Sequence, residues 1–266
     1  MEKNSILKLT DVTKRFGGLL AVDSLNIDVK EHSIHSLIGP NGAGKTTTVN
    51  LITGVLPVTS GTVEFDGKNV TGKKTYEIAR LGIGRTFQNI KVFQTMTLLE
   101  NIMVGGNQLT KMGIVRTILD FKGSAREEKM LKEKAEGLLD KLGMYHLRNE
   151  YMKNLAYGRQ KISEIARAMM TDPKLILLDE PAAGLNPSER AELVKVIQKS
   201  YEEGFAFFLI EHNMDVVMNL SDDITVLSFG KKIAAGTPAE IRDNDEVITA
   251  YLGSAFVKNK EQEGAE

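Results

Sequence analysis

Apolar runs of strand length alternate with amphipathic segments along most of the chain. Residues 175–178 and 206–210 are continuously apolar, which is typical of strands that are buried on both faces of a sheet. Residues 33–38, 83–88 and 224–228 are further strand candidates, and segments of helical periodicity lie between them. The alternation predicts an α/β fold whose core is a parallel sheet with right-handed crossover connections.

The first part of the chain has the pattern of an antiparallel portion. Residues 6–9 and two pieces within residues 19–29 alternate apolar and polar positions, as half-buried strands do. Residues 61–65 predict another strand, which an Asp66-Gly67 turn closes. We therefore expect an antiparallel β portion ahead of and beside the parallel core.

The pattern becomes helical after residue 88. Thr97 with Glu100 and Ser124 with Glu127 have the spacing of capping boxes, and leucine and alanine then recur at helical spacing until Gly143. The charged residues 126–134 have the pattern of a solvated helix face. These patterns predict a core of residues 1–88 and 173–254, a helical subdomain of residues 89–172 and a polar tail of residues 255–266.

Composition excludes several classes of protein. The 266 residues are 42% hydrophobic, and the absence of cysteine excludes a disulfide scaffold and any cysteine-based metal site. With 34 basic and 35 acidic residues the formal net charge is -1, so we expect no nucleic-acid partner. No apolar run is long enough to cross a membrane, and the first residues lack the apolar region of a signal peptide. We expect a chain that is soluble when isolated.

The candidate chemistry centres on the sequence GPNGAGKT at residues 39–46, which matches the P-loop pattern G-x-x-x-x-G-K-[ST]. Its glycines allow successive backbone N–H groups to face one concavity at a helix N-terminus, where phosphates bind. Lys45 can reach the terminal phosphates, and the Thr46 hydroxyl can ligate Mg²⁺. The nucleotide is expected to contact Gly39, Pro40, Asn41, Gly42, Ala43, Gly44, Lys45, Thr46 and Thr47.

Polar residues also follow the predicted parallel strands, whose carboxyl ends meet at one edge of the sheet. Asp179 can hold Mg²⁺, and Glu180 can orient and deprotonate an attacking water, a contribution of about 10²–10⁴-fold. Gln88 and His212 end two other strands, and neither is informative alone. Phe16 precedes the site in a turn, where it could stack on a base or fill the core.

Taken together, the motifs resemble the ATP-binding subunit of an ABC transporter. The resemblance covers residues 7–252 and includes the P-loop, TFQ at 86–88, LAYG at 155–158 before EIARA at 164–168, and EPAAGLNP at 180–187. The segments RTFQNI, NLAYG and IEHNMDVV are similar to one of the two ATPase subunits of high-affinity branched-chain amino acid importers. The ATPase of lipopolysaccharide export is a close variant of the same pattern.

The resemblance implies that residues 1–254 form an ABC ATPase domain and assigns roles to single residues. Phe16 matches the adenine-stacking aromatic residue, and Gln88 matches the glutamine that contacts Mg²⁺ and the attacking water. His212 matches the switch histidine on the γ-phosphate, and Asn186 lies in the loop that crosses between subunits.

The signature segment departs from the commonest form of the family, Leu-Ser-Gly-Gly-Gln. Ala156 replaces its serine, Tyr157 a glycine and Arg159 the glutamine, so the hydroxyl contact to the partner's γ-phosphate is absent. Backbone N–H groups near Gly158 remain candidates for that phosphate.

The resemblance also implies partners. A head-to-tail dimer with a second ABC ATPase, identical or different, would hydrolyse ATP and drive two polytopic permease subunits from the cytoplasmic face of the inner membrane. The transported amino acid would bind other proteins. Two alternatives are a soluble ABC ATPase that acts on a nucleic acid or protein assembly and a non-hydrolytic nucleotide-binding module. Glu180 argues against the second alternative.

Overall fold

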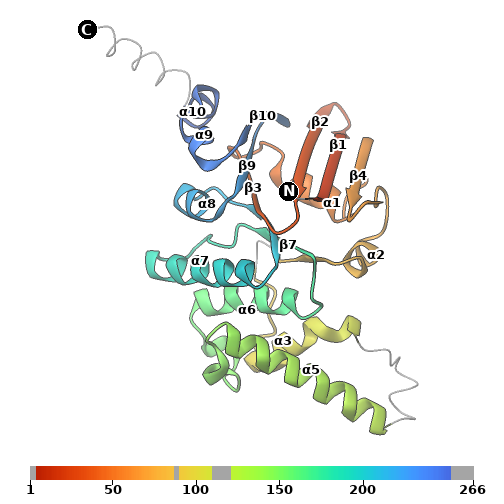
Figure 1. Cartoon of the computed structure of the whole chain (residues 1–266), viewed down its shortest axis with the longest axis vertical. Coiled ribbons are helices and arrows are strands. Elements are labelled where there is room, and N and C mark those ends of the chain that lie inside the picture. The colour runs from red at the N-terminus through yellow and green to blue at the C-terminus, as the bar shows by residue number, and fades with distance from the viewer. Residues whose placement is uncertain (1–3, 87–89, 110–120, 253–266) are drawn as a thin grey trace.

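The computed structural model describes residues 4–86, 90–109 and 121–252 of the chain. Within these residues the strands form two sheets, and the long helices between residues 98 and 169 are grouped at one end of the molecule (Figure 1). The smaller sheet is antiparallel and has the strand order β2 (Leu19–Lys30), β1 (Ser5–Phe16), β4 (Ser60–Phe65) and β5 (Lys68–Asn69). The predicted antiparallel portion is confirmed, with one continuous strand over residues 19–30 in place of two pieces.

The larger sheet contains the predicted parallel strands. Its order is β10 (Lys231–Gly236), β9 (Asp223–Ser228), β3 (Ile34–Ile38), β8 (Ala206–Ile210), β7 (Leu175–Asp179) and β6 (Ile83–Arg85). All neighbours in it are parallel except β10, which pairs antiparallel with β9. The sequence analysis did not predict β10. This strand lies at the edge of the sheet and its residues are exposed or half-buried, so it needs no continuous apolar run.

Helices cover the parallel sheet. They are α1 (Lys45–Ile52), α2 (Thr75–Arg80), α7 (Pro187–Glu202), α8 (Met214–Leu220), α9 (Pro238–Arg242) and α10 (Asp245–Leu252). Local signals explain two of their starts: α7 and α9 each begin with proline after a residue whose side chain accepts an N–H of the first turn. Both capping boxes join a residue to a glutamate three positions later, Asn186 to Glu189 and Thr237 to Glu240.

The stretch between β6 and β7 is helical where it is described. It contains α3 (Leu98–Gly105), α5 (Phe121–Lys141), α6 (Tyr157–Met169) and three short 3₁₀ helices (Gly106–Leu109, Tyr145–Leu147 and Met152–Asn154). Thr97 caps α3 as predicted. The capping box predicted at Ser124 is wrong, because α5 already begins at Phe121 and the backbone around Ser124 is therefore inside the helix. The proposed division into core and subdomain stays a prediction.

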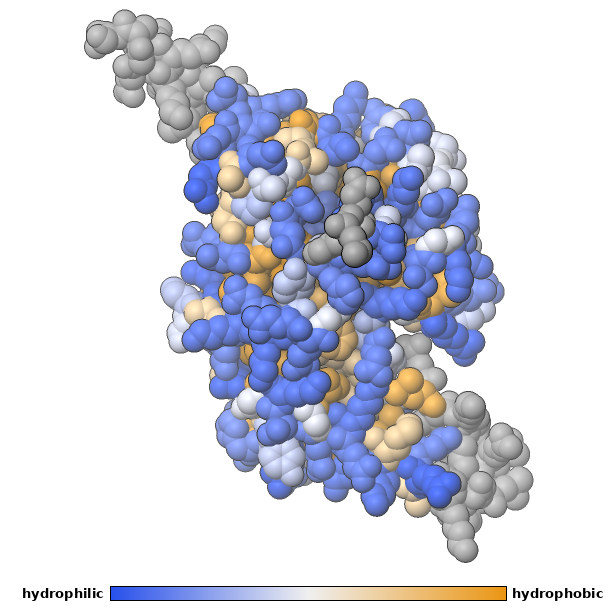
Figure 2. All heavy atoms as spheres, in the orientation of Figure 1, coloured by the Kyte–Doolittle hydropathy of each residue, from blue (hydrophilic) through white to orange (hydrophobic). Residues whose placement is uncertain are grey.

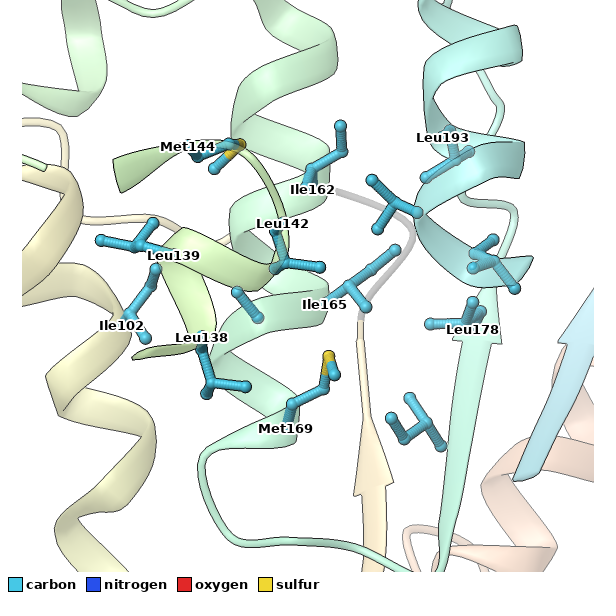
Figure 3. Packing of buried hydrophobic residues seen from close by; sticks show 14 of the residues in the cluster. Ile102, Leu138, Leu139, Leu142, Met144, Ile162, Ile165, Met169, Leu178 and Leu193 are labelled. Carbon is cyan, nitrogen blue, oxygen red and sulfur yellow. The ribbon is translucent and has the colours of Figure 1, made fainter. Parts of the chain in front are cut away.

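The core has two layers, one on each face of the parallel sheet. Along β7, Ile176 and Leu178 pack toward the helical region, and Leu175 and Leu177 pack toward the antiparallel sheet. Figure 3 shows α6 between α5 and β7, with Ile165 and the other labelled side chains forming one continuous apolar cluster. Burial of each large side chain contributes roughly 1.5–3 kcal/mol, so this cluster anchors the helical region to the sheet.

Across the described ranges, no helix is both long enough and apolar enough to cross a membrane. The face seen in Figure 2 is mostly hydrophilic, with hydrophobic side chains in small patches.

Candidate nucleotide-binding site

The P-loop joins β3 to α1 and depends on its glycines. Gly39, Gly42 and Gly44 have φ angles of 149°, 77° and 103°, a region that favours glycine. A Cβ atom on Gly39 would lie 2.1 Å from the Leu227 carbonyl oxygen, and one on Gly44 would lie 2.6 Å from that of Ala21. The loop therefore packs against β9 and β2 so closely that side chains are excluded at these two positions.

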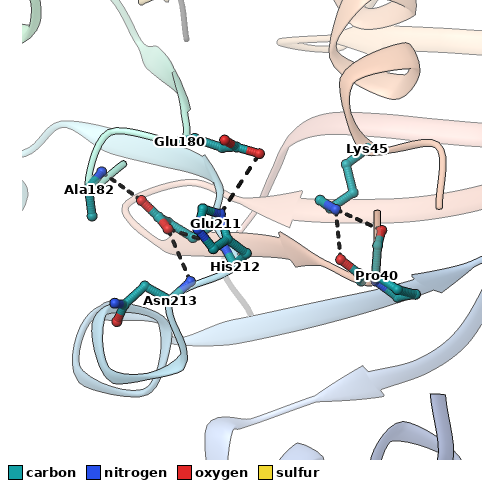
Figure 4. A network of polar contacts seen from close by, with 8 residues as sticks. Pro40, Lys45, Glu180, Ala182, Glu211, His212 and Asn213 are labelled. Atoms are coloured by element: carbon teal, nitrogen blue, oxygen red, sulfur yellow. Dashed lines mark hydrogen bonds and ion pairs between the residues drawn. The ribbon is translucent and has the colours of Figure 1, made fainter. Parts of the chain in front are cut away.

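The side chain of Lys45 reaches back to the first residues of the P-loop. Its Nζ donates hydrogen bonds to the carbonyl oxygens of Gly39 at 2.7 Å and Pro40 at 3.0 Å (Figure 4). Burial lowers the pKa of Lys45, and the nearby carboxylates of Glu180 and Asp179 oppose this shift because they favour the charged amine. The cation is thus held at the mouth of the loop by contacts that phosphate oxygens can replace.

Asp179 ends β7 and is buried. Its Oδ2 lies 3.4 Å from an Nη of Arg85, and within the described residues its buried Oδ1 accepts no hydrogen bond. Burial raises the pKa of Asp179, while the positive charge of Arg85 opposes the shift. A buried carboxylate oxygen that no described residue satisfies, near the Lys45 amine of the loop, fits Mg²⁺, which prefers oxygen ligands.

No three histidine, aspartate or glutamate side chains gather into a metal-binding group in the described ranges. Mg²⁺ does not require such a group, since it usually keeps several waters and binds one or two carboxylates together with substrate phosphates. The residues present therefore fit an ion that arrives with the nucleotide.

Glu180 and His212 face each other from the ends of β7 and β8. Their Oε1 and Nδ1 atoms are 3.9 Å apart (Figure 4). Glu180 has a φ of 49°, an unusual backbone conformation that costs on the order of 1–3 kcal/mol and occurs often at functional sites. Its backbone N–H donates to the carbonyl oxygen of Ile210 at 2.9 Å, which holds the strained residue next to the end of β8.

Glu211 is a residue that the sequence analysis missed. Its carboxylate is fully buried and accepts hydrogen bonds from the backbone N–H groups of Ala182, His212 and Asn213 at 2.7, 3.1 and 3.2 Å (Figure 4). Burial raises the pKa of Glu211, and the three N–H donors oppose the shift. The sequence did contain a feature that could have identified Glu211, namely a carboxylate placed directly after an apolar strand and before His212.

Phe16, the P-loop and Glu180 line one pocket of about 480 Å³. Phe16 is the last residue of β1 and is 44% exposed, so of the two roles left open for it the structure excludes core filling. The lining of the pocket combines the apolar side chains of Phe16 and Leu19 with the polar side chains of Lys45 and Thr46. A nucleotide has the same combination in its base and its phosphates.

A protein-family model described as "ABC transporter" matches residues 22–183. The chain belongs to the ABC transporter family. A second model, "Branched-chain amino acid ATP-binding cassette transporter", matches residues 231–257. This agrees with the family expected from the sequence motifs.

Several relatives in the ABC family are similar over nearly their whole length. The high-affinity branched-chain amino acid transport ATP-binding protein BraF of Pseudomonas aeruginosa is 43% identical over 94% of this chain and 98% of its own length. LivG of Escherichia coli, which bears the same description, is 42% identical over the same shares. Among solved structures, the ADP conformation of MJ1267, an ATP-binding cassette of an ABC transporter, is 34% identical, with a TM-score of 0.82 over 94% of this chain and 100% of that one. The predicted family and fold class are confirmed.

The ABC signature segment lies at the start of α6. The described lining of the pocket does not include Ala156, Gly158 or Asn186. The Gly158 N–H, a candidate phosphate donor, donates instead to Oε1 of Glu189 at 3.1 Å, and the side chain of Asn186 caps α7. The ion pair Arg159–Glu192, at 2.7 Å, adds a second link between α6 and α7. Gln88 lies outside the described residues.

Proposed function

We propose that this chain is the ATP-binding and ATP-hydrolysing subunit of an ABC importer for branched-chain amino acids. One observation carries the ATPase proposal: Phe16, Lys45 and Glu180, from three separate parts of the chain, line a single pocket. The likeness to BraF and LivG over 94% of the chain supports the class of transported substrate.

The residues around the pocket have distinct roles in this proposal. The backbone of residues 39–44 and the Lys45 amine would bind the phosphates, and Phe16 would stack on the adenine. Thr46, Asp179 and Gln88 would hold Mg²⁺, which neutralises charge on the phosphate oxygens when it is bound.

The ends of β7 and β8 supply the groups for hydrolysis. Glu180 would orient the attacking water and accept its proton, and His212, 3.9 Å from Glu180, would contact the γ-phosphate. The fixed backbone around both residues supports this assignment, because a general base must be held at a defined distance from the water.

A second ATPase subunit would complete the site. The positions of Ala156, Gly158 and Asn186 outside the chain's own pocket support a head-to-tail dimer, in which these residues face the nucleotide of the partner. A hydrogen bond from Gly158 N–H to that nucleotide would require the Glu189 carboxylate to move away.

Two permease subunits would hold the chain at the cytoplasmic face of the membrane as a peripheral protein. A groove of about 320 Å³, lined by Ile78 of α2, Val104 of α3 and Arg167 of α6 among others, supports this proposal. Beside the groove, two side chains of α6 hold the backbone of Lys91. Glu164 Oε1 accepts a hydrogen bond from the Lys91 N–H at 2.7 Å, and Arg167 donates one to the Lys91 carbonyl oxygen at 2.5 Å. Helix α6 therefore fixes the position of Lys91, three residues after Gln88.

Nucleotide titration tests the ATP site. Lys45→Ala should weaken ATP binding severely because it removes the buried cation of the loop. The exposed Lys132→Ala is the matched control. Equal affinities for ATP in the two variants would refute the assignment of the pocket.

Cross-linking in native membranes tests the transporter proposal. A photoreactive residue at Phe93, which is 50% exposed beside Lys91, should yield adducts with polytopic membrane proteins. A photoreactive residue placed instead at the exposed Lys68 on β5, in the antiparallel sheet, should yield no adducts with membrane proteins. Recovery of soluble partners alone from Phe93 would favour a soluble ABC ATPase.

A further inference from the structure

Phe229 occupies an unusual place beside the nucleotide pocket. It is 90% exposed and, with Gly230, forms the two-residue turn between β9 and β10. The φ angles of the two residues are 46° and 79°, so both have left-handed backbone conformations. A hairpin turn of this kind favours asparagine, aspartate or glycine at its first position, because a bulky side chain is strained there.

The same chain contains the ordinary form of this turn. Asp66-Gly67 joins β4 to β5 with φ angles of 51° and 69°. The two turns have the same length and similar φ angles, and only one of them has a phenylalanine where a small polar residue fits better. The folded chain therefore retains a strained aromatic residue at a position where it buries almost none of its own surface.

Backbone hydrogen bonds hold this turn against the P-loop. The N–H of Gly230 donates to the Ala43 carbonyl oxygen at 3.0 Å, and the N–H of Asp23 donates to the Gly230 carbonyl oxygen at 2.9 Å. A Cβ on Gly230 would lie 2.9 Å from the Ala21 carbonyl oxygen, which shows how closely the turn approaches β2. The position of Phe229 relative to the phosphate-binding loop is thus defined by main-chain contacts.

Phe229 and Phe16 flank the first residues of β2. Phe16 pairs with Leu19 across the β1–β2 hairpin, and the Phe229 turn contacts Ala21 and Asp23 on the other edge of the strand. Phe16, Leu19 and Phe229 are all exposed and line the same pocket as the P-loop. They are the exposed apolar part of a lining that also contains the Lys45 amine.

We propose that the ring of Phe229 contacts the nucleobase of the bound nucleotide and forms, with Phe16, a two-sided aromatic site. The inference rests on the proposed function, since it assigns a further residue to the same ATP site. Base contact would use the exposed apolar surface of Phe229 and would account for an aromatic residue in a turn that disfavours it.

Phe229→Asn provides a sharp test, because asparagine is the residue that this turn prefers and the variant should fold at least as stably as the wild type. The full chain, the variant and the control Tyr145→Asn, at an exposed aromatic residue outside the pocket, are titrated with ATP and with inorganic tripolyphosphate. Loss of one base-stacking contact should raise the Kd for ATP by about tenfold, which corresponds to ~1.4 kcal/mol. The Kd for tripolyphosphate should not change.

An ATP Kd of Phe229→Asn within twofold of the wild type would overturn the inference while leaving the proposed function intact. Equal weakening of ATP and tripolyphosphate would also overturn it, because the variant would then act through the P-loop. Loss of ATP-dependent dimerisation with unchanged ATP affinity would assign Phe229 to a subunit contact instead. A wild-type chain that binds neither ligand would refute the proposed function, and this inference with it.

Discussion

Oε1 of Glu211 accepts a hydrogen bond from the N–H of Ala182 at 2.7 Å, and this bond joins the loop after β8 to the loop after β7. Glu180 lies two residues before Ala182, and His212 directly follows Glu211. Because Oε2 of the same carboxylate accepts the N–H groups of His212 and Asn213, one buried side chain sets the spacing of both candidate catalytic residues. We regard Glu211 as a positioning residue, since it acts through Glu180 and His212.

Glu211→Gln should lower the rate of ATP hydrolysis without changing the affinity for ATP. A glutamine has a single acceptor oxygen, so its NH₂ group would face N–H donors that the carboxylate satisfies, at a cost of about 1–3 kcal/mol. Single-turnover hydrolysis, nucleotide titration and urea unfolding are measured together. Glu203→Gln, in a surface ion pair with Lys141, is the matched control. Wild-type turnover in a destabilised Glu211→Gln would mean that the residue serves stability alone.

Glu180→Gln should bind ATP normally and hydrolyse it about 10²–10⁴-fold more slowly, because the amide keeps the shape of the side chain and cannot accept the water's proton. Bound ATP should then persist, and dimer should accumulate over monomer in sedimentation. The same change at Glu202, on the exposed end of α7, is the control. If Glu180→Gln turned over at the wild-type rate in a single cycle, another residue would be the base.

Gly158→Ala tests the contact between α6 and α7. The added Cβ would lie 3.0 Å from Cβ and Cγ of Glu189, so Glu189 must move by a few tenths of an ångström. We expect a loss of about 1–3 kcal/mol in stability and of dimer-dependent hydrolysis, with ATP binding to the monomer retained. Gly137→Ala, in α5 with no atom within 4 Å of the new Cβ, should stabilise the chain slightly. Unaltered stability and hydrolysis in Gly158→Ala would show that Glu189 accommodates the added methyl group without cost.

The stability of the fold should fall as the pH drops from about 6.5 toward 4, because burial lowers the pKa of His35 from 6.5 to about 4. In that window the unfolded chain binds a proton that the folded chain does not, so acid favours unfolding. The two pKa values correspond to a loss of up to about 3 kcal/mol. The free energy of unfolding, measured with urea at several pH values in this range, should depend less steeply on pH in His35→Gln than in the wild type. The exposed His146→Gln is the control. If the free energy of unfolding depended on pH equally in His35→Gln and the wild type, the predicted contribution of His35 would be refuted.

Local patterns in the sequence determined many of the elements and the phosphate-binding loop, although they did not predict β10. The apolar run at residues 175–178 required a buried strand, the spacing of Gly39, Gly44 and Lys45 required a P-loop, and Asn186 with Glu189 marked a helix start. Each of these depends on residues that are close in the chain, so short-range geometry and burial are sufficient to predict it. Ser124 shows the limit, since the same spacing has no capping role once the helix has begun upstream.

Only the tertiary structure decided which distant residues share a contact. Glu211 lies 29 residues from Ala182, and Glu189 lies 31 residues from Gly158, so no local pattern relates the members of either pair. Phe229 could be recognised only after its turn was found hydrogen-bonded to the P-loop, because a phenylalanine before a glycine has no fixed meaning in a sequence. These contacts depend on how β7, β8 and β9 assemble beside β3, and the burial of both sheet faces sets that assembly.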